Sequence, residues 1–266
     1  RLFRTRWGTR RVAPHALNRK MHQDWIDALI VPGEIIVKRE LKGIPISPER
    51  IHVIYYPVDL PPNFPIEVVR DYREEFNIPS GHQVLAVVGR IRPEKGHHLL
   101  LKAFQRFRKR FTDITLLILH RNTPPDHPEF RMVRKTVLDL GLESCVRFDS
   151  ERDDIRGLMA FADAGVISSI ASEVICRVAV EFFSVGTPVT ALPTGCLPEI
   201  VIEGHNGTLA SRSSPDSLCE ALVRLFKDSE ALMTMSIKAR KDAETRFNPG
   251  LLLEKTLAVY QQVLES

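Results

Sequence analysis

The sequence lacks the cysteine patterns that mark a zinc site or a redox pair. Its 266 residues include four cysteines, and no two of them have C-x-x-C spacing. We therefore expect free thiols, as in proteins of the reducing cytosol. No apolar run approaches the roughly 18 residues of a membrane-spanning helix, and no secretory leader segment is evident. Together these absences favour a cytoplasmic protein.

Acidic residues are missing from the first 20 positions. The whole chain has a formal net charge of only +4, too small to indicate a nucleic-acid-binding protein. We interpret the start as a solvated basic segment, with peripheral contact to an anion or to the inner face of a membrane as the alternative. The basic residues concerned are Arg1, Arg4, Arg6, Arg10, Arg11, Arg19 and Lys20.

The common phosphate-binding and catalytic motifs are also missing. Neither the Walker pattern G-x-x-x-x-G-K-[ST] nor G-x-G-x-x-G occurs after any expected strand. The nine histidines show no metal-ligand spacing. No nucleophile, histidine and acid form a convincing catalytic set. We therefore expect no metal site and no resident cofactor.

Short apolar segments alternate with helical ones from residue 84 to residue 210. This alternation predicts a doubly wound parallel sheet, an α/β fold with helices on both faces. We expect its strands at residues 84–89, 114–120, 145–148, 164–169, 188–192 and 207–210. We further expect three parts: a remnant of a second domain with an interdomain segment (1–60), the main α/β domain (61–246) and a C-terminal helix (247–266).

Ligands of such sheets bind where the strands end, at their carboxyl edge. The first expected strand is followed by the turn "GRIRPEKG", which begins at Gly89 and contains Arg90 and Lys95. Backbone N–H groups of a strand-to-helix turn attract anions, and an arginine fork fits a phosphate. The turn therefore indicates a phosphate site, although a basic surface loop has the same composition.

The stretch "SEVICRVAVE" places Glu173 and Glu181 in an otherwise apolar segment. A buried carboxylate needs a partner or a task, and vicinal sugar hydroxyls can supply the partner. On the helix expected at 172–186, the two would lie roughly 12 Å apart along the axis. Glu173 could instead stabilise only the helix start. After the next strand, "PTGCLPEI" contributes a tight turn at Gly195, then Glu199. These side chains suit a nucleotide sugar.

The order of these motifs resembles that of the retaining glycosyltransferases of family four, which have the GT-B fold. The motifs are G-R-x-x-x-x-K-G, E-x7-E, G-x-P-V-x-A and P-E, and the resemblance runs from about Arg4 to Tyr260. It implies that Arg90 and Lys95 bind the donor diphosphate. It also implies that Glu173 holds the transferred sugar and Glu181 the ribose, without an obligatory metal. We group Gly89, Gly195 and Glu199 with Glu181 as donor-binding positions.

The sequence departs from the family pattern in three places. The family usually follows its first glutamate with a glycine-rich turn, whereas here the stretch that begins at Glu173 is "EVIC". A second glycine-rich turn of the family is replaced by "HRNTPP" at 120–125. Only the last elements of an N-terminal acceptor domain are evident. Because Arg1 is not a methionine, we expect a piece of a longer protein. Because the acceptor domain is incomplete, we expect this piece to bind a nucleotide sugar but to transfer nothing to a saccharide or lipid-linked acceptor by itself. A nucleotide-sugar epimerase and a non-catalytic nucleotide-binding module remain the alternatives.

Overall fold

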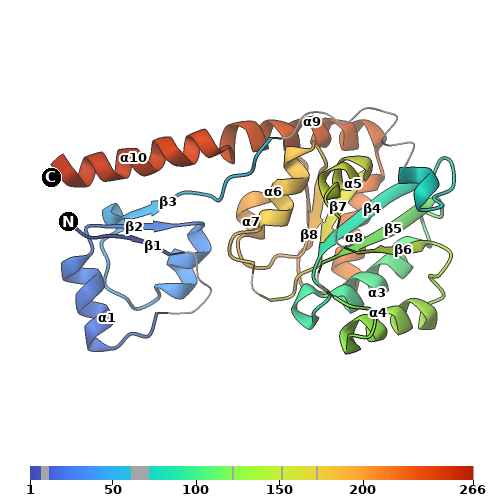
Figure 1. Cartoon of the computed structure of the whole chain (residues 1–266), viewed down its shortest axis with the longest axis horizontal. Coiled ribbons are helices and arrows are strands. Elements are labelled where there is room, and N and C mark those ends of the chain that lie inside the picture. Colours follow the sequence, from blue (N-terminus) through green and yellow to red (C-terminus); the bar gives the residue numbers. More distant parts are fainter. Residues whose placement is uncertain (7–11, 61–71, 122, 151, 172, 266) are drawn as a thin grey trace.

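The computed structural model describes residues 1–266 except 7–11, 61–71, 122, 151, 172 and 266. In this described part, the larger sheet has six parallel strands in the order β6-β5-β4-β7-β8-β9 (Figure 1). This confirms the predicted doubly wound parallel sheet. The strands are β4 (Gln83–Gly89), β5 (Ile114–His120), β6 (Val146–Asp149), β7 (Ala164–Ile167), β8 (Val189–Ala191) and β9 (Gly207–Leu209).

Alternate residues of the central strands face two different cores. Leu85 and Val87 of β4 belong to a core with α3, α4 and α8, whereas Val84 and Ala86 belong to a core with α5, α6, α7 and α9. Because successive side chains of a strand point to opposite faces and both faces are covered, β4 is apolar at every position from Val84 to Val88. The helices are α3 (His97–Phe107), α4 (Pro128–Asp139), α5 (Ile155–Phe161), α6 (Arg177–Ser184), α7 (Leu197–Ile200), α8 (Pro215–Phe226) and α9 (Ser229–Arg246).

The N-terminal residues form a second, smaller sheet, here called the N-terminal unit; β4 to β9 and their helices are the larger unit. Its strands β1 (Phe3–Thr5), β2 (Ala28–Val31) and β3 (Ile51–Val53) pair in parallel. The helical stretch near the start of this unit ends at Trp25. In this stretch α1 (Ala16–Lys20) continues as a π-helical turn, Met21–Trp25, and then the buried residues of β2 begin.

The C-terminal helix α10 (Pro249–Glu265) leaves the larger unit and runs along the N-terminal unit (Figure 1). Its Val259 and Val263 pack with Ala28 and Ile30 of β2. The boundary expected at residue 61, with its proline-rich segment, lies outside the described residues, as do Arg10 and Arg11 of the basic segment. In the described part, no helix is both long and apolar enough to cross a membrane.

Two of the four cysteines form a disulfide, so the expectation of four free thiols is wrong. Cys176 and Cys196 are joined, with their Cα atoms 6.4 Å apart, whereas Cys145 and Cys219 are free. The two bonded residues lie in the loops that follow β7 and β8. Because β7 and β8 are neighbours in the sheet, those loops meet at its carboxyl edge. Spacing along the sequence contains no trace of this proximity.

Candidate functional site

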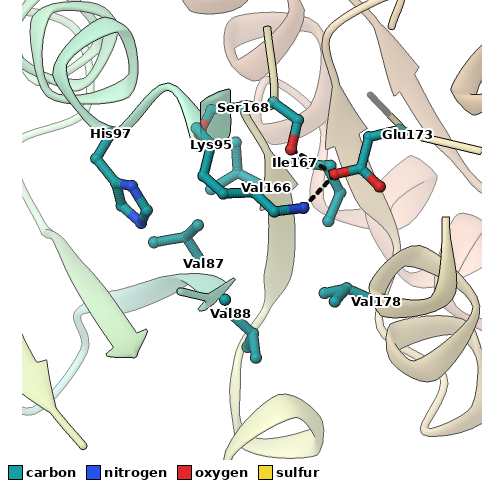
Figure 2. A pocket seen from close by; sticks show the side chains of 11 residues that line it. Val87, Val88, Lys95, His97, Val166, Ile167, Ser168, Glu173 and Val178 are labelled. Atoms are coloured by element: carbon teal, nitrogen blue, oxygen red, sulfur yellow. Dashed lines mark hydrogen bonds and ion pairs between the residues drawn. The ribbon is translucent and has the colours of Figure 1, made fainter. Parts of the chain in front are cut away.

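The strand order changes direction at β4, with β5 and β6 on one side and β7 to β9 on the other. Such a point, at the carboxyl ends of the strands, is where open α/β sheets bind ligands. Lys95 follows β4 and Glu173 follows β7, and the Lys95 ammonium donates to Oε1 of Glu173 (Figure 2). Ser169 Oγ donates to the same oxygen at 2.5 Å. The structure therefore brings together two residues that are 78 positions apart.

Two adjoining hollows open beside this ion pair. The smaller has a volume of about 20 Å³, room for one water molecule, and contains Glu173 in its wall. The larger has a volume of about 660 Å³ and contains Arg90 and Glu181. Both include Gly89 and Lys95 in their walls. The motif residues Gly89, Arg90, Lys95, Glu173 and Glu181 thus line two neighbouring hollows that share Gly89 and Lys95.

The larger hollow is strongly basic. Beyond the residues named from the sequence, its lining has Arg121 after β5 and Arg152, Arg156 and Arg177 from later loops and helices. Sequence reasoning missed these residues. A usable signal was present, because Arg121 directly follows the expected strand 114–120 and Arg152 lies in the segment after the expected strand 145–148, so both belong at the same edge of the sheet. An excess of cations in a hollow attracts anionic ligands.

Helix α6 begins later than the sequence suggested. Its first residue is Arg177, and its N-cap, Cys176, has a φ of +52°. A left-handed residue cannot continue a right-handed helix, so Glu173 lies in the preceding loop and the helical spacing of roughly 12 Å does not apply. Glu181 lies on the helix, where Arg177 Nε donates to its Oε1 at 2.8 Å. The two glutamates therefore come from different kinds of structure.

Gly195 lies directly against the backbone of Glu173. It has a φ of +59°, and a Cβ atom built there would lie 1.8 Å from the carbonyl oxygen of Glu173. The next residue, Cys196, donates its backbone N–H to that oxygen at 2.7 Å. Gly195 is in the wall of neither hollow. Direct contact with a donor stays a prediction, while its close approach to Glu173 is a feature of the structure.

The Glu199 carboxylate points away from the two hollows toward the N-terminal unit. It accepts the backbone N–H of Glu34 and that of Ile35, each at 2.7 Å. The Tyr55 hydroxyl donates to it at 3.4 Å. Burial raises the pKa of Tyr55, and the nearby Glu199 charge raises it further. The donor contact suggested for Glu199 stays a prediction, and the observed partners point to another role, developed below.

His97, the first residue of α3, is a buried titratable group in the wall of the smaller hollow (Figure 2). Its side chain is 2% exposed, and neither ring nitrogen has a hydrogen-bond partner among the described residues. Burial, with smaller contributions from the nearby His98, Lys95 and His120, lowers the pKa of His97 to about 4. The folded protein therefore keeps this imidazole neutral at mildly acidic pH.

The neutral His97 should make the fold less stable as the pH falls. Between pH 6.5 and about 4, His97 is protonated in the unfolded chain but stays neutral in the folded chain. The free energy of unfolding should thus lose about 2 kcal/mol from this group between pH 7 and pH 5. Denaturant unfolding of His97→Leu should show a correspondingly smaller loss. Equal pH dependence in the wild type and the variant would contradict this.

Comparison with known proteins finds glycosyltransferases. The family model of glycosyl transferases group 1 matches residues 68–242. The D-inositol 3-phosphate glycosyltransferase of Corynebacterium glutamicum is 32% identical over 65% of this chain and 42% of its own length. YtcC of Bacillus subtilis is 29% identical over 91% of this chain and 61% of its own length. The chain thus spans roughly half the length of these curated relatives.

Solved structures agree on the fold. A glycosyltransferase from Rickettsia africae superposes with a TM-score of 0.88 at 20% identity, covering 99% of this chain and 71% of the other. Anabaena HepE in complex with UDP-glucose superposes with a TM-score of 0.78 at 22% identity, covering 93% of this chain and 66% of the other. Since the family model covers more than half of the sequence, this chain belongs to the group 1 glycosyl transferases.

Proposed function

We propose that this chain binds a nucleotide diphosphate sugar in the larger hollow, with the sugar next to the Lys95–Glu173 ion pair. In the whole protein, the sugar would be transferred with retention to a saccharide or lipid-linked acceptor. The observation that carries the proposal is the Lys95–Glu173 ion pair at the switch point of the sheet, beside a basic hollow of about 660 Å³. A hollow of this size is within the usual range for a small-molecule site.

The cations have the task of holding and neutralising the diphosphate. Arg90 and Lys95 border the same hollow from one turn, and charge-assisted hydrogen bonds to phosphate are stronger than neutral ones. In the transfer step, negative charge develops on the departing nucleotide. Lys95 and Arg90 would stabilise that charge in place of a metal ion. We therefore expect nucleotide binding to survive EDTA.

The carboxylates have the task of accepting sugar hydroxyls. Glu173 makes an ion pair with Lys95, which lines the larger hollow, so it suits the transferred sugar next to the phosphates. Glu181 borders the larger hollow, one of its oxygens already accepting from Arg177. Its other oxygen suits the ribose. The N-terminal unit would face the acceptor side. Membrane contact through residues 1–20 and a cytoplasmic location stay predictions.

Replacing the two glutamates should separate their roles. Glu181→Ala should weaken UDP and UDP-sugar alike, because both ligands carry the ribose. Glu173→Ala should weaken only the UDP-sugar or slow its transfer. Each loss should be about 10-fold, the value of one hydrogen bond to a charged group. Calorimetric titration with the two ligands measures this, and the exposed Glu220 on α8, replaced by alanine, is the control.

The function itself is tested with a panel of UDP-, GDP- and ADP-sugars. Thermal melting identifies the donor that stabilises the protein, and labelled donor then follows transfer to saccharide and lipid acceptors by the full-length protein. Failure to bind any member of the panel would overturn the proposal. Conversion of the donor sugar without an acceptor would favour an epimerase, and binding without any turnover would favour a non-catalytic module.

A further inference from the structure

Glu199 connects the two units of the molecule across a long stretch of sequence. Its two carboxylate oxygens accept from the backbone N–H groups of Glu34 and Ile35, 165 and 164 positions away. Those two residues begin the short helical segment 34–40 of the N-terminal unit. The first N–H groups of a helix lack partners within the helix. Glu199 therefore supplies from the larger unit the acceptor that this segment lacks.

The contact is closely fitted on both sides. A Cβ atom built on Gly33 would lie 3.2 Å from Glu199 Oε2 and 3.4 Å from Cys196 Cβ, so a larger residue there would crowd the carboxylate. Within the larger unit, Arg246 of α9 donates to the Glu199 carbonyl oxygen at 3.1 Å. Its other terminal nitrogen donates to Asp242 at 2.8 Å. The Glu199 backbone is thus hydrogen-bonded within its own unit, while its carboxylate packs closely against the N-terminal unit.

The segment from Cys196 to Glu199 is also hydrogen-bonded to the loop that contains Glu173. Glu199 donates its backbone N–H to the Cys196 carbonyl at 2.9 Å, and Cys196 donates its own to the Glu173 carbonyl at 2.7 Å. The disulfide joins Cys196 to Cys176, three residues after Glu173. Figure 1 shows α7, which contains Glu199, on the side of the larger unit that faces the N-terminal unit. One segment therefore bears on both Glu173 and Glu34.

We propose that Glu199 is a positioning residue that latches the N-terminal unit onto the larger unit and sets its placement relative to Glu173. The role in transfer rests on the proposed function, whereas the latch itself does not. Transfer needs the reacting groups of donor and acceptor at about 3–3.5 Å. A carboxylate that binds one unit to the other, next to the sugar-holding loop, can maintain such a distance without touching the donor.

The first measurement is hydrogen exchange at the amides of Glu34 and Ile35. In Glu199→Ala these amides lose their acceptor and should exchange about 10- to 100-fold faster, in line with the loss of a charge-assisted hydrogen bond. Amides of β4 and β5 should keep their protection. The matched control is Glu203→Ala, because Glu203 accepts from Leu209 N–H and Arg224 inside the larger unit. That variant should speed exchange at Leu209 and leave residues 34 and 35 unchanged.

The second measurement separates positioning from binding. In the full-length protein, the affinity of Glu199→Ala for UDP should stay within about twofold of the wild type, while its kcat for transfer at saturating donor falls about 10-fold or more. Glu199→Gln keeps the side-chain length and one suitable acceptor, so its kcat should be intermediate. Gly33→Ala keeps Glu199 but crowds it, and should also speed exchange at residues 34 and 35. This variant tests the latch even if Glu199→Ala does not fold.

Two results would overturn the latch. Unchanged exchange at residues 34 and 35 in both Glu199→Ala and Gly33→Ala would show that the carboxylate does not hold the N-terminal unit. A loss of UDP affinity as large as the loss of kcat would show that Glu199 contacts the nucleotide. A full-length wild-type protein that transfers no sugar would refute the proposed function instead, and the exchange measurement would still decide on the latch.

Discussion

Replacing Lys95 with alanine should weaken UDP binding about 10- to 100-fold. The lysine borders both hollows and makes an ion pair with Glu173. A charge-assisted hydrogen bond contributes roughly 1.5–3 kcal/mol, which corresponds to this range of affinity. The variant also leaves the Glu173 carboxylate without its cation, which adds to the loss for a sugar-bearing donor. Titration calorimetry with UDP and with a UDP-sugar measures both effects.

Arg90→Ala should behave in the same way, because Arg90 borders the larger hollow from the same turn. The matched control is Arg92→Ala. Arg92 is exposed on that turn and lies in the wall of neither hollow, so its loss should change the affinity less than twofold. If Lys95→Ala and Arg90→Ala both kept full affinity, the diphosphate would have to bind elsewhere.

Replacing Gly195 with alanine should lower the free energy of unfolding by about 2–5 kcal/mol, the sum of a conformational and a steric cost. The backbone at Gly195 has a φ of +59°, which costs a residue with a Cβ roughly 1–2 kcal/mol. In addition, the new Cβ would lie 1.8 Å from the Glu173 carbonyl oxygen, so the backbone of one loop must move. Moving this loop also displaces Glu173. Denaturant unfolding measures the stability, and UDP-sugar titration measures the effect on the site.

Gly204→Ala is the matched control for this substitution. Gly204 has a φ of +70°, but a Cβ built there would meet nothing within 4 Å. Its substitution should therefore cost only the conformational part, roughly 1–2 kcal/mol. The difference between the two variants isolates the close approach to Glu173. Equal losses would mean that Gly195 is required only for its backbone conformation.

The sequence alone predicted the strands of the larger sheet and the position of the basic turn at its carboxyl edge. Apolar runs such as those at 84–89 and 114–120 are properties of consecutive residues, and each became a buried strand. The basic turn at Gly89 to Lys95 could be placed at the carboxyl edge by the same reasoning, because it directly follows a strand. The strands of the N-terminal unit could not be predicted in the same way, because a three-residue strand such as β1 is too short to show a pattern of apolar residues.

Only the tertiary structure decided which distant residues meet. Helical periodicity suggested that Glu173 begins a helix, but the left-handed Cys176 and its disulfide to Cys196 end that continuity. The partners of Glu199 lie about 165 positions away in another unit. Pairings of this kind arise from strand order and from the packing of one unit on another. Local composition carries no record of either, so motif spacing could name Glu199 but not what it binds.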